Sequence, residues 1–239
     1  MTVIKRFSFF LVLLLASAGT QAQEHITLLS PWTVGLRGGW SSSTISRYDG
    51  GRMDESYAAL GGFEAGIQAR YSFNDWLALR ANLSFMQRSH RMDRSLNYLD
   101  PVYTNHINDY LMLPLVADFS FGEAYPSPFS RLRGHLLAGG YVGYWLSERR
   151  KGTTYWMTDY YVYFEPFDEK REFTSSDQRL CAGLTFGAAL SYTFGKRLGL
   201  DLEVLYYYDL TSHHKGYKNL ADPRYLNTLS LTLNANYNL

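Results

Sequence analysis

The sequence lacks the features that define several protein classes. Its single cysteine, Cys181, excludes an intrachain disulfide and any cysteine-rich zinc or iron–sulfur centre. The 23 lysine and arginine residues are balanced by 22 aspartate and glutamate residues, which excludes an acidic tail and nucleic-acid binding through bulk positive charge. Glycine and proline have average abundance, which excludes a collagen-like or low-complexity chain. After the N-terminal segment no run approaches 18 apolar residues, so the sequence predicts no transmembrane helix.

The N-terminal segment has the parts of a secretory signal peptide. Lys5 and Arg6 form a positive end, residues 7–18 form an uncharged and largely apolar run, and small residues follow. A membrane anchor would need roughly 20 apolar residues, which this run does not reach. No cysteine follows the run, so it is not a lipoprotein signal. We therefore expect residues 1–22 to be a signal peptide that is cleaved after Ala22, and residues 23–239 to form one exported domain.

The rest of the chain alternates between apolar and polar residues with a period of two. In residues 61–73, for example, Phe63 and Ile67 share one face, whereas Glu64 and Gln68 share the other. A β-strand places alternate side chains on opposite faces, so this pattern predicts a strand with one apolar and one charged face. The pattern recurs and predicts eight strands, over residues 32–45, 61–73, 76–88, 107–121, 131–147, 178–194, 198–211 and 225–239.

The predicted connections alternate in length. Those at 74–75, 122–130 and 195–197 are short, whereas those at 46–60, 89–106, 148–177 and 212–224 are long. Short turns at one end and long loops at the other are typical of an outer-membrane β-barrel. We therefore expect an all-β fold, an eight-stranded antiparallel up-and-down transmembrane β-barrel with long extracellular loops.

A secreted β-sandwich is the alternative, because its strands also alternate. The length of the apolar faces favours the barrel: they cover five to seven alternate residues, enough to cross a bilayer, whereas soluble strands have about five or six residues in all. Aromatic residues make up 16% of the chain. Many gather beside the short turns, as expected for an interfacial girdle: Tyr71, Phe73, Trp76, Phe119, Phe121, Tyr192, Phe194 and Tyr237.

The polar faces of such a barrel point inward, and eight strands enclose a space that side chains can fill. Isolated charges are costly to bury, so we expect the inward charges to pair and to plug the lumen. A selectivity ring for solutes is the alternative. The predicted inward charges are Arg37, Arg70, Arg80, Arg133 and Arg179 with Glu64, Asp118, Asp201, Glu203 and Asp209.

Three further residues face the predicted lumen. We expect His135 to be hydrogen-bonded there and Cys181 to fill space, with a reactive thiol as the alternative. Pro114 has no N–H for the strand ladder. We therefore expect it at a β-bulge, or where a lumen group or water satisfies the opposing carbonyl, with a gating hinge as the alternative.

Residues 110–119, with the sequence YLMLPLVADF, resemble the YLxIPLLxKY strand of PorT-like outer-membrane β-barrel proteins. Residues 137–144 and 206–211 are also similar to that family, and strand order and spacing extend the resemblance over most of the mature chain. Met112 and the terminal Leu239 depart from the family, in which an acidic or polar residue and Phe are usual. The resemblance implies a small barrel in the outer membrane of a Gram-negative bacterium. One family member takes part in type IX secretion, which implies an accessory role in envelope secretion as an alternative function.

Some eight-stranded barrels are lipid A-modifying enzymes, but the sequence does not support such an activity. Ser212, His213 and His214 follow a strand near Asp209 and have the groups of an acyl hydrolase. Adjacent residues point to opposite sides of a strand, however, and the segment does not match the His-x-Ser-Asn pattern of known deacylases. The two histidines with His90 or His106 would offer metal ligands, yet no carboxylate spacing supports them. We predict no catalytic, cofactor-binding or metal-binding residue, no cofactor and no enzymatic activity.

The longest predicted loop, residues 148–177, combines basic and aromatic side chains. Alternation over residues 160–164 predicts that the strands continue above the membrane as a hairpin that turns near Pro166. Aromatic residues with arginine are typical of binding hot spots, and basic residues suit lipopolysaccharide phosphates. Its aromatic residues are Tyr155, Trp156, Tyr160, Tyr161, Tyr163, Phe164, Phe167 and Phe173.

These patterns predict a structural or interaction role through the extracellular loops. The expected partners are outer-membrane lipid and lipopolysaccharide, with an envelope protein or an extracellular ligand at loop 148–177, and no nucleic acid. An outer aromatic girdle with a self-packed hairpin is the alternative explanation of that loop. A small porin and a lipid A-modifying enzyme are alternative functions.

Overall fold

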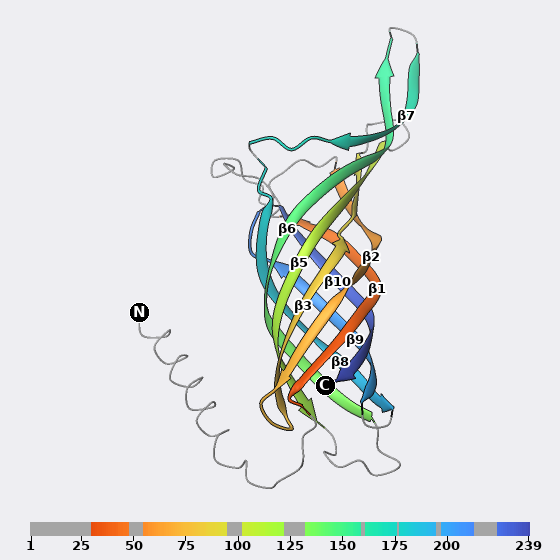
Figure 1. Cartoon of the computed structure of the whole chain (residues 1–239). Coiled ribbons are helices and arrows are strands. Elements are labelled where there is room, and N and C mark those ends of the chain that lie inside the picture. Colours follow the sequence, from red (N-terminus) through yellow and green to blue (C-terminus); the bar gives the residue numbers. More distant parts are fainter. Residues whose placement is uncertain are drawn as a thin grey trace, which may run out of the picture.

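The computed structural model describes residues 30–47, 55–94, 102–121, 132–158, 161–175, 177–194, 197–212 and 224–239. The predicted signal peptide and its cleavage site lie outside these residues. No helix in the described part of the chain is long and apolar enough to cross a membrane. The described strands are β1 (Trp32–Arg47), β2 (Glu55–Ser72), β3 (Leu77–Gln87), β4 (His90–Arg94), β5 (Val102–Phe121), β6 (Leu132–Met157), β7 (Val162–Arg171), β8 (Leu180–Phe194), β9 (Leu198–Asp209) and β10 (Arg224–Asn238) (Figure 1).

The strands close into one antiparallel barrel. β1 pairs with β10 and β2, and the ring continues through β3, β5, β6, β8 and β9 back to β10. β3 and β4 lie end to end, since both pair with β2 and β5. β7 and β8 likewise follow one another along β6. The ten strands therefore occupy eight positions in the barrel, which confirms the predicted eight-stranded, all-β antiparallel fold.

Several strands extend beyond their predicted ends. β1 continues to Arg47, β2 begins at Glu55, and β4 with the first part of β5 occupies much of residues 89–106. The prediction of loops over 46–60 and 89–106 is therefore wrong for most of these residues. Above the apolar band the outward side chains are no longer apolar, so the period-two pattern fades while backbone pairing continues. One wall, formed by β5, β6 and β7, consequently rises above the rest of the barrel (Figure 1).

The alternation of the barrel side chains is confirmed. Leu36 and Ile67 point outward and are more than half exposed, whereas Arg80 and Glu203 point inward and are fully buried. The molecule thus has an apolar outside and a polar inside, the reverse of a soluble domain.

The aromatic residues near the short turns also lie where the sequence placed them. Neighbouring rings contact one another, as in the pairs Trp76–Phe119 and Tyr192–Phe194. Trp76, Phe119, Tyr192 and Phe194 are all at least 38% exposed, so they form an outward-facing girdle at that end of the barrel.

Pro114 does not lie at a bulge. The β3–β5 pairing has the same register on both sides of it, at Ala81↔Leu115 and Ser84↔Met112, and the ladder is only interrupted in between. Of the two predicted settings for Pro114, the bulge is therefore wrong, because the flanking pairs keep the register across it. A lumen group or water at the opposing carbonyl stays a prediction. The register shift lies instead next to Asp109, in the β5–β6 pairing.

Candidate functional site

The lumen at the short-turn end holds a network of buried ion pairs. The Arg80 guanidinium lies 2.7 Å from the Asp118 carboxylate and 2.5 Å from that of Glu203. Arg37 lies 2.9 Å from Glu64 and 3.1 Å from Glu203. The side chains of these five residues are all fully buried. The predicted pairing of inward charges is therefore confirmed for these residues.

Asp118 is the most connected carboxylate of this network. Besides Arg80 it contacts Arg70 at 3.0 Å and Nδ1 of His135 at 2.7 Å. Nε2 of His135 in turn lies 2.8 Å from the Ser191 hydroxyl. His135 is therefore a hydrogen-bonded lumen residue, as predicted.

A second cluster surrounds Arg88, which the predicted set of inward charges omitted. Arg88 is fully buried, lies 2.8 Å from the Asp209 carboxylate and donates to the Thr228 hydroxyl at 2.8 Å. Its guanidinium also lies 5.3 Å from the ring centre of Tyr110 and 5.9 Å from that of Tyr141. Arg88 lies eight residues after Arg80 and therefore on the same strand face, a spacing that was available in the sequence.

Two predicted inward charges have other surroundings. The Arg179 guanidinium lies over the rings of Phe173 and Tyr144, at 4.4 and 4.6 Å, because β8 begins only after it. The prediction that Arg179 joins the lumen ion pairs is therefore wrong. Arg133 donates to the backbone carbonyl of Asp75 at 3.4 Å, at the short-turn end.

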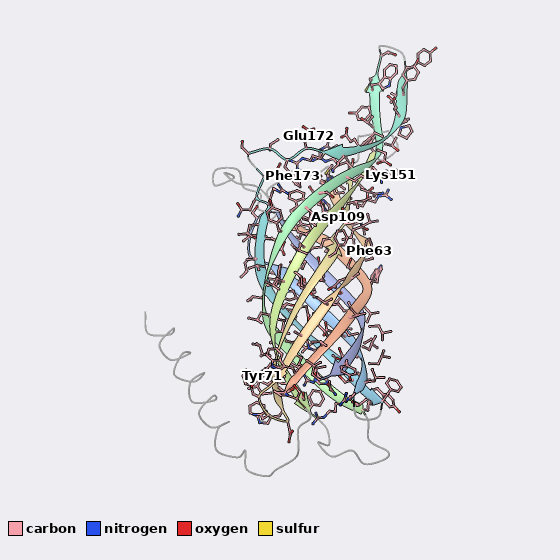
Figure 2. The ribbon with its side chains drawn as sticks, in the orientation of Figure 1. Phe63, Tyr71, Asp109, Lys151, Glu172 and Phe173 are labelled. Atoms are coloured by element: carbon pink, nitrogen blue, oxygen red, sulfur yellow. The ribbon has the colours of Figure 1, made fainter. Side chains whose placement is uncertain are left out.

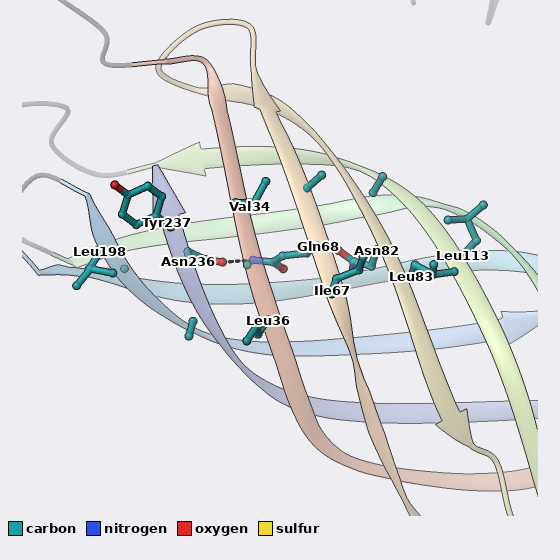
Figure 3. A pocket seen from close by; sticks show the side chains of 15 residues that line it. Val34, Leu36, Ile67, Gln68, Asn82, Leu83, Leu113, Leu198, Asn236 and Tyr237 are labelled. Atoms are coloured by element: carbon teal, nitrogen blue, oxygen red, sulfur yellow. Dashed lines mark hydrogen bonds between the residues drawn. The ribbon is translucent and has the colours of Figure 1, made fainter. Parts of the chain in front are cut away.

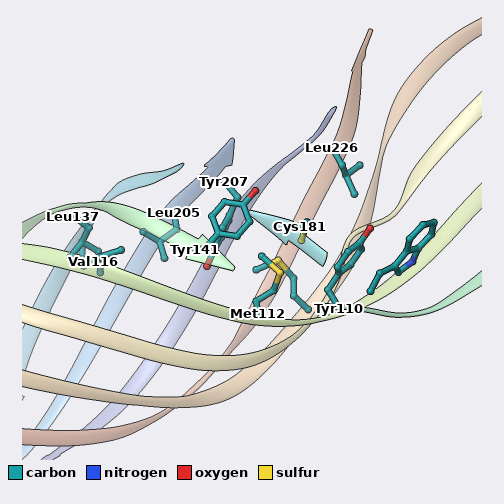
Figure 4. Close-up of a cluster of buried hydrophobic side chains, with 12 residues drawn as sticks. Tyr110, Met112, Val116, Leu137, Tyr141, Cys181, Leu205, Tyr207 and Leu226 are labelled. Atoms are coloured by element: carbon teal, nitrogen blue, oxygen red, sulfur yellow. The ribbon is translucent and has the colours of Figure 1, made fainter. Parts of the chain in front are cut away.

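A cluster of buried, largely apolar side chains also lies inside the barrel (Figure 4). Cys181 is buried among them, and Gly143 provides the room, since a Cβ there would meet both the Cys181 and the Met112 sulfur at less than 3 Å. Cys181 thus occupies the lumen position that the sequence predicted. The cluster consists of Met86, Tyr110, Met112, Val116, Leu137, Tyr141, Trp145, Cys181, Ala189, Leu205, Tyr207 and Leu226.

The described residues between β7 and β8, 172–175 and 177–179, which we call the cap, lie at the outer end of the barrel (Figure 2). Phe173 packs edge-on against Trp145 with ring centres 4.9 Å apart, and Trp145 stacks on Tyr110 at 6.0 Å. These rings form a column that ends on Arg88. The sequence did not predict the cap, because its contacts join residues that are far apart in the chain.

Glu148 anchors the cap to the barrel wall. Its carboxylate lies 2.9 Å from Nδ1 of His106, 2.8 Å from Arg150 and 2.7 Å from Arg171. Burial favours the neutral carboxyl, but the hydrogen bonds from these three side chains outweigh it and hold the pKa of Glu148 well below its usual range. Glu148 is therefore a charged group fixed at the outer rim.

Asp177 holds the other side of the cap. Arg171 reaches it at 2.7 Å, and the Thr174 N–H donates to it at 2.7 Å. Burial again opposes ionisation, but these hydrogen bonds lower the pKa of Asp177 below its usual value. Arg171 thus connects Glu148 with Asp177 and ties the cap to β6.

β6 and β7 form the predicted hairpin above the barrel (Figures 1 and 2). Thr158 and Tyr161 close its turn, with the Thr158 N–H donating to the Tyr161 carbonyl at 2.9 Å. The predicted turn near Pro166 is wrong, because Pro166 lies within β7 opposite Thr153. Proline is tolerated in strands that are paired on one side only, and within the described chain β7 pairs with β6 alone.

The end of this hairpin exposes large apolar side chains, which we call the aromatic tip (Trp156, Met157, Tyr161, Tyr163 and Phe164). Trp156 and Tyr163 stack with ring centres 4.3 Å apart. Tyr161 is 67% and Met157 64% exposed. The tip is therefore preorganised by its own stacking yet open to solvent.

A polar hollow of about 260 Å³, which we call the vestibule, lies on the inner side of the raised wall. His90 and His106 face each other there as a stacked pair, with ring centres 4.7 Å apart. Among the described residues no three His, Cys, Asp or Glu side chains are placed to hold a metal ion. His213 and His214, the other predicted metal candidates, lie outside the described residues. The vestibule is lined by Tyr57, His90, Met92, Arg94, Thr104, His106, Arg150, Phe167 and Glu169.

A shallow apolar groove of about 690 Å³ runs over the outer surface of β10, β1, β2 and β3 (Figure 3). Its floor is low where Ala69 faces Ala81 across the β2–β3 pair, and Leu36 and Ile67 border it. The groove belongs to the apolar outside of the barrel.

A closed antiparallel barrel with an apolar outside, a charged and filled inside and an aromatic girdle at one end is a membrane-spanning β-barrel protein of the outer-membrane type. Residues 21–215 match the family described as outer membrane protein beta-barrel domain, and the chain belongs to this family. Membership indicates the outer membrane of a Gram-negative bacterium. This match does not distinguish the PorT-like group that residues 110–119 resemble.

Solved structures of similar fold include other outer-membrane proteins. OprG from Pseudomonas aeruginosa shares 11% identity and a TM-score of 0.50, over 87% of this chain and 95% of that one. Neisserial surface protein A shares 15% identity and a TM-score of 0.46, over 88% and 98%. Escherichia coli outer membrane protein W shares 12% identity and a TM-score of 0.42, over 88% and 99%. A comparison with curated proteins finds no match. At these identities the similarity describes the fold alone.

Proposed function

We propose that the protein is a filled outer-membrane anchor that presents a contact surface at its extracellular end. The lumen supports the first half of this proposal. Arg80 and Arg88 are fully buried and ion-paired across the barrel, so a solute would have to separate these pairs in order to pass. Separating buried pairs costs several kcal/mol each, roughly 3–5 kcal/mol.

The observation that carries the second half is the aromatic tip. Aromatic residues on a protruding hairpin, with arginines at its base, have the composition of an interaction hot spot. Stacking of Trp156 on Tyr163 fixes the shape before binding, which lowers the entropic cost of contact. β7 also leaves one strand edge without a partner in the described chain, and an extended segment of another protein can add to such an edge. We propose another envelope or surface protein as the partner.

Site-specific photo-crosslinking in intact cells tests this proposal. A photoreactive amino acid at Tyr161 should give discrete protein adducts, whereas one at Tyr208, which is exposed on the barrel wall, should give none. The adducts should disappear in the variant Trp156→Ala/Tyr163→Ala. Heat-modifiable migration of the variant verifies that its barrel still folds. Equal labelling at Tyr161 and Tyr208 would refute a contact role of the tip.

An accessory role in envelope secretion is a second candidate, favoured by the similarity of residues 110–119 to PorT-like proteins. It predicts that deletion of the gene reduces the amount of secreted proteins in the culture medium. An unchanged set of secreted proteins would eliminate it.

The proposal includes no catalytic step. Lipid A extracted from a deletion strain is therefore expected to keep its acylation and phosphorylation pattern in mass spectra. A changed pattern would replace this proposal with the lipid A-modifying alternative.

A further inference from the structure

A second feature of the raised wall faces away from the barrel. Along β6, Glu148 and Arg150 turn toward the lumen and vestibule, so the alternate residues Arg149 and Lys151 face outward. Figure 2 shows Lys151 on this outer side, at the base of the hairpin. On β7, Glu169 lines the vestibule, so Lys170 faces outward too. These positions have no part in the aromatic tip.

Strand pairing gathers the outward basic residues into one patch. Arg91, Asn105, Lys151 and Asp168 occupy one continuous row across β4, β5, β6 and β7. Arg149 and Lys170 are directly paired in the next row. We call Arg91, Arg149, Lys151 and Lys170 the outer basic patch.

The net charge of this surface is positive. Asp93 lies 2.7 Å from Arg91, and Asp168 lies 2.5 Å from Arg149, so two of the four cations are neutralised. Asp168 is also the cross-strand partner of Lys151 and interacts with it electrostatically, but no ion pair in the described part of the chain includes Lys151 or Lys170. The two ammonium groups are therefore available to an external anion.

The patch begins at the outer edge of the outer-leaflet headgroup region and extends just above it. The outward residues Tyr144 and Leu146 of β6 belong to the apolar band, at 42% and 40% exposure. With a rise of about 3.3 Å per residue and a tilt of about 40°, Arg149 and Lys151 stand roughly 8 and 13 Å beyond Leu146 along the membrane normal. The headgroup region is about 5–8 Å deep on each side of a bilayer, and lysine side chains extend back toward it.

We propose that the outer basic patch binds the phosphate groups of lipid A in the outer leaflet. Lys151 and Lys170 supply charge-assisted hydrogen bonds to the phosphate oxygens, while Arg91 and Arg149 flank them. Asp168 limits the affinity of the patch for phosphate, because its carboxylate is ion-paired with Arg149. This side of the barrel thus binds phosphorylated lipid, and this binding does not depend on any protein bound at the aromatic tip.

Native mass spectrometry of the full chain in detergent micelles, titrated with bisphosphorylated lipid A, tests this inference. The variant Lys151→Gln/Lys170→Gln should bind about tenfold more weakly, since it loses two charged donors. Asp168→Asn should bind about threefold more tightly, because it frees Arg149. Arg197→Gln, which removes an exposed arginine at the opposite end of the barrel, is the matched control and should bind like the wild type.

Three results would overturn the inference: unchanged binding in the double lysine variant, an equal loss in Arg197→Gln, or equal affinity for dephosphorylated lipid A. Heat-modifiable migration verifies that each variant is folded. The lysine variant keeps the aromatic tip, so its crosslinking at Tyr161 separates failure of this inference from failure of the proposed function.

Discussion

Asp118 is the residue on which the lower ion-pair network depends most, since Arg70, Arg80 and His135 all contact it. Asp118→Asn keeps the shape of the side chain but removes its charge. It leaves the fully buried Arg80 and the partly buried Arg70 without their shared carboxylate, so we expect the free energy of unfolding to fall by about 3–5 kcal/mol. Urea-induced unfolding in detergent micelles, followed by tryptophan fluorescence, measures the loss.

Asp75→Asn is the matched control for this prediction. Asp75 is exposed at the turn before β3, and its described contact with Arg133 uses the backbone carbonyl, which the substitution keeps. We expect its effect on stability to be small. If both variants unfolded at the same urea concentration, the buried network would not stabilise the barrel.

Gly143 tests how tightly the lumen is filled. A Cβ at this position would lie 2.6 Å from the Met112 sulfur and 2.7 Å from the Cys181 sulfur. Gly143→Val should therefore destabilise the barrel by about 1–3 kcal/mol through overpacking. At Gly140, three residues earlier on the outward face, a Cβ would meet only the Gly183 carbonyl at 3.4 Å.

We accordingly expect Gly140→Val to be tolerated, and the same urea titration compares the two variants. Equal stability of Gly143→Val and wild type would mean that the lumen has empty space at this level.

At the scale of the strands, the sequence predicted most of what lies within the membrane. A strand with lipid on one side and a polar lumen on the other must alternate, so the period of two located all eight barrel positions. That requirement ends at the bilayer surface. The extensions of β1, β2 and β5, and the inclusion of Pro166 in β7, were therefore missed.

The candidate site was predicted only in part for a related reason. The sequence indicated a hairpin rich in aromatic residues, because composition and alternation are local properties. The cap over Trp145 and the anchoring of Glu148 depend on contacts between β5, β6 and the segment after β7. The inward position of Glu148 depends on the register shift next to Asp109, which changes the alternation of β6 after Trp145 and which no local pattern encodes.

The cap provides a prediction about pH. In the folded protein the pKa of Glu148 is lowered, so its ionised form contributes stability above the unfolded carboxyl pKa of about 4.3. That contribution is lost as the pH falls through the lower folded pKa. Glu148→Gln should be less stable than wild type at pH 7, and the difference should shrink as the pH is lowered below about 4.

Urea unfolding of both proteins from pH 7 to pH 3 measures this difference, and other carboxylates cancel in the comparison. A difference that stayed constant over this range would show that the charge of Glu148 does not hold the cap.

At the scale of the whole molecule, the barrel has different kinds of contact at different levels along its axis. The lower lumen is an ion-paired core, the upper lumen is filled by rings and apolar side chains, and the raised wall of β5, β6 and β7 carries the surfaces that can meet partners (Figure 1). In the proposed function, a core of this kind anchors the wall and closes the lumen to solutes. The proposed anchoring role therefore requires a lumen that is closed in the folded, inserted protein.

Single-channel recording in a planar lipid bilayer tests this dependence most directly. Folded wild-type protein, verified by heat-modifiable migration of the reconstituted sample, should produce no steady conductance steps in potassium chloride. Reproducible steps of constant size would contradict the proposed closed lumen, because ions would then have to pass the buried ion pairs of Arg80 and Arg88 and the aromatic column.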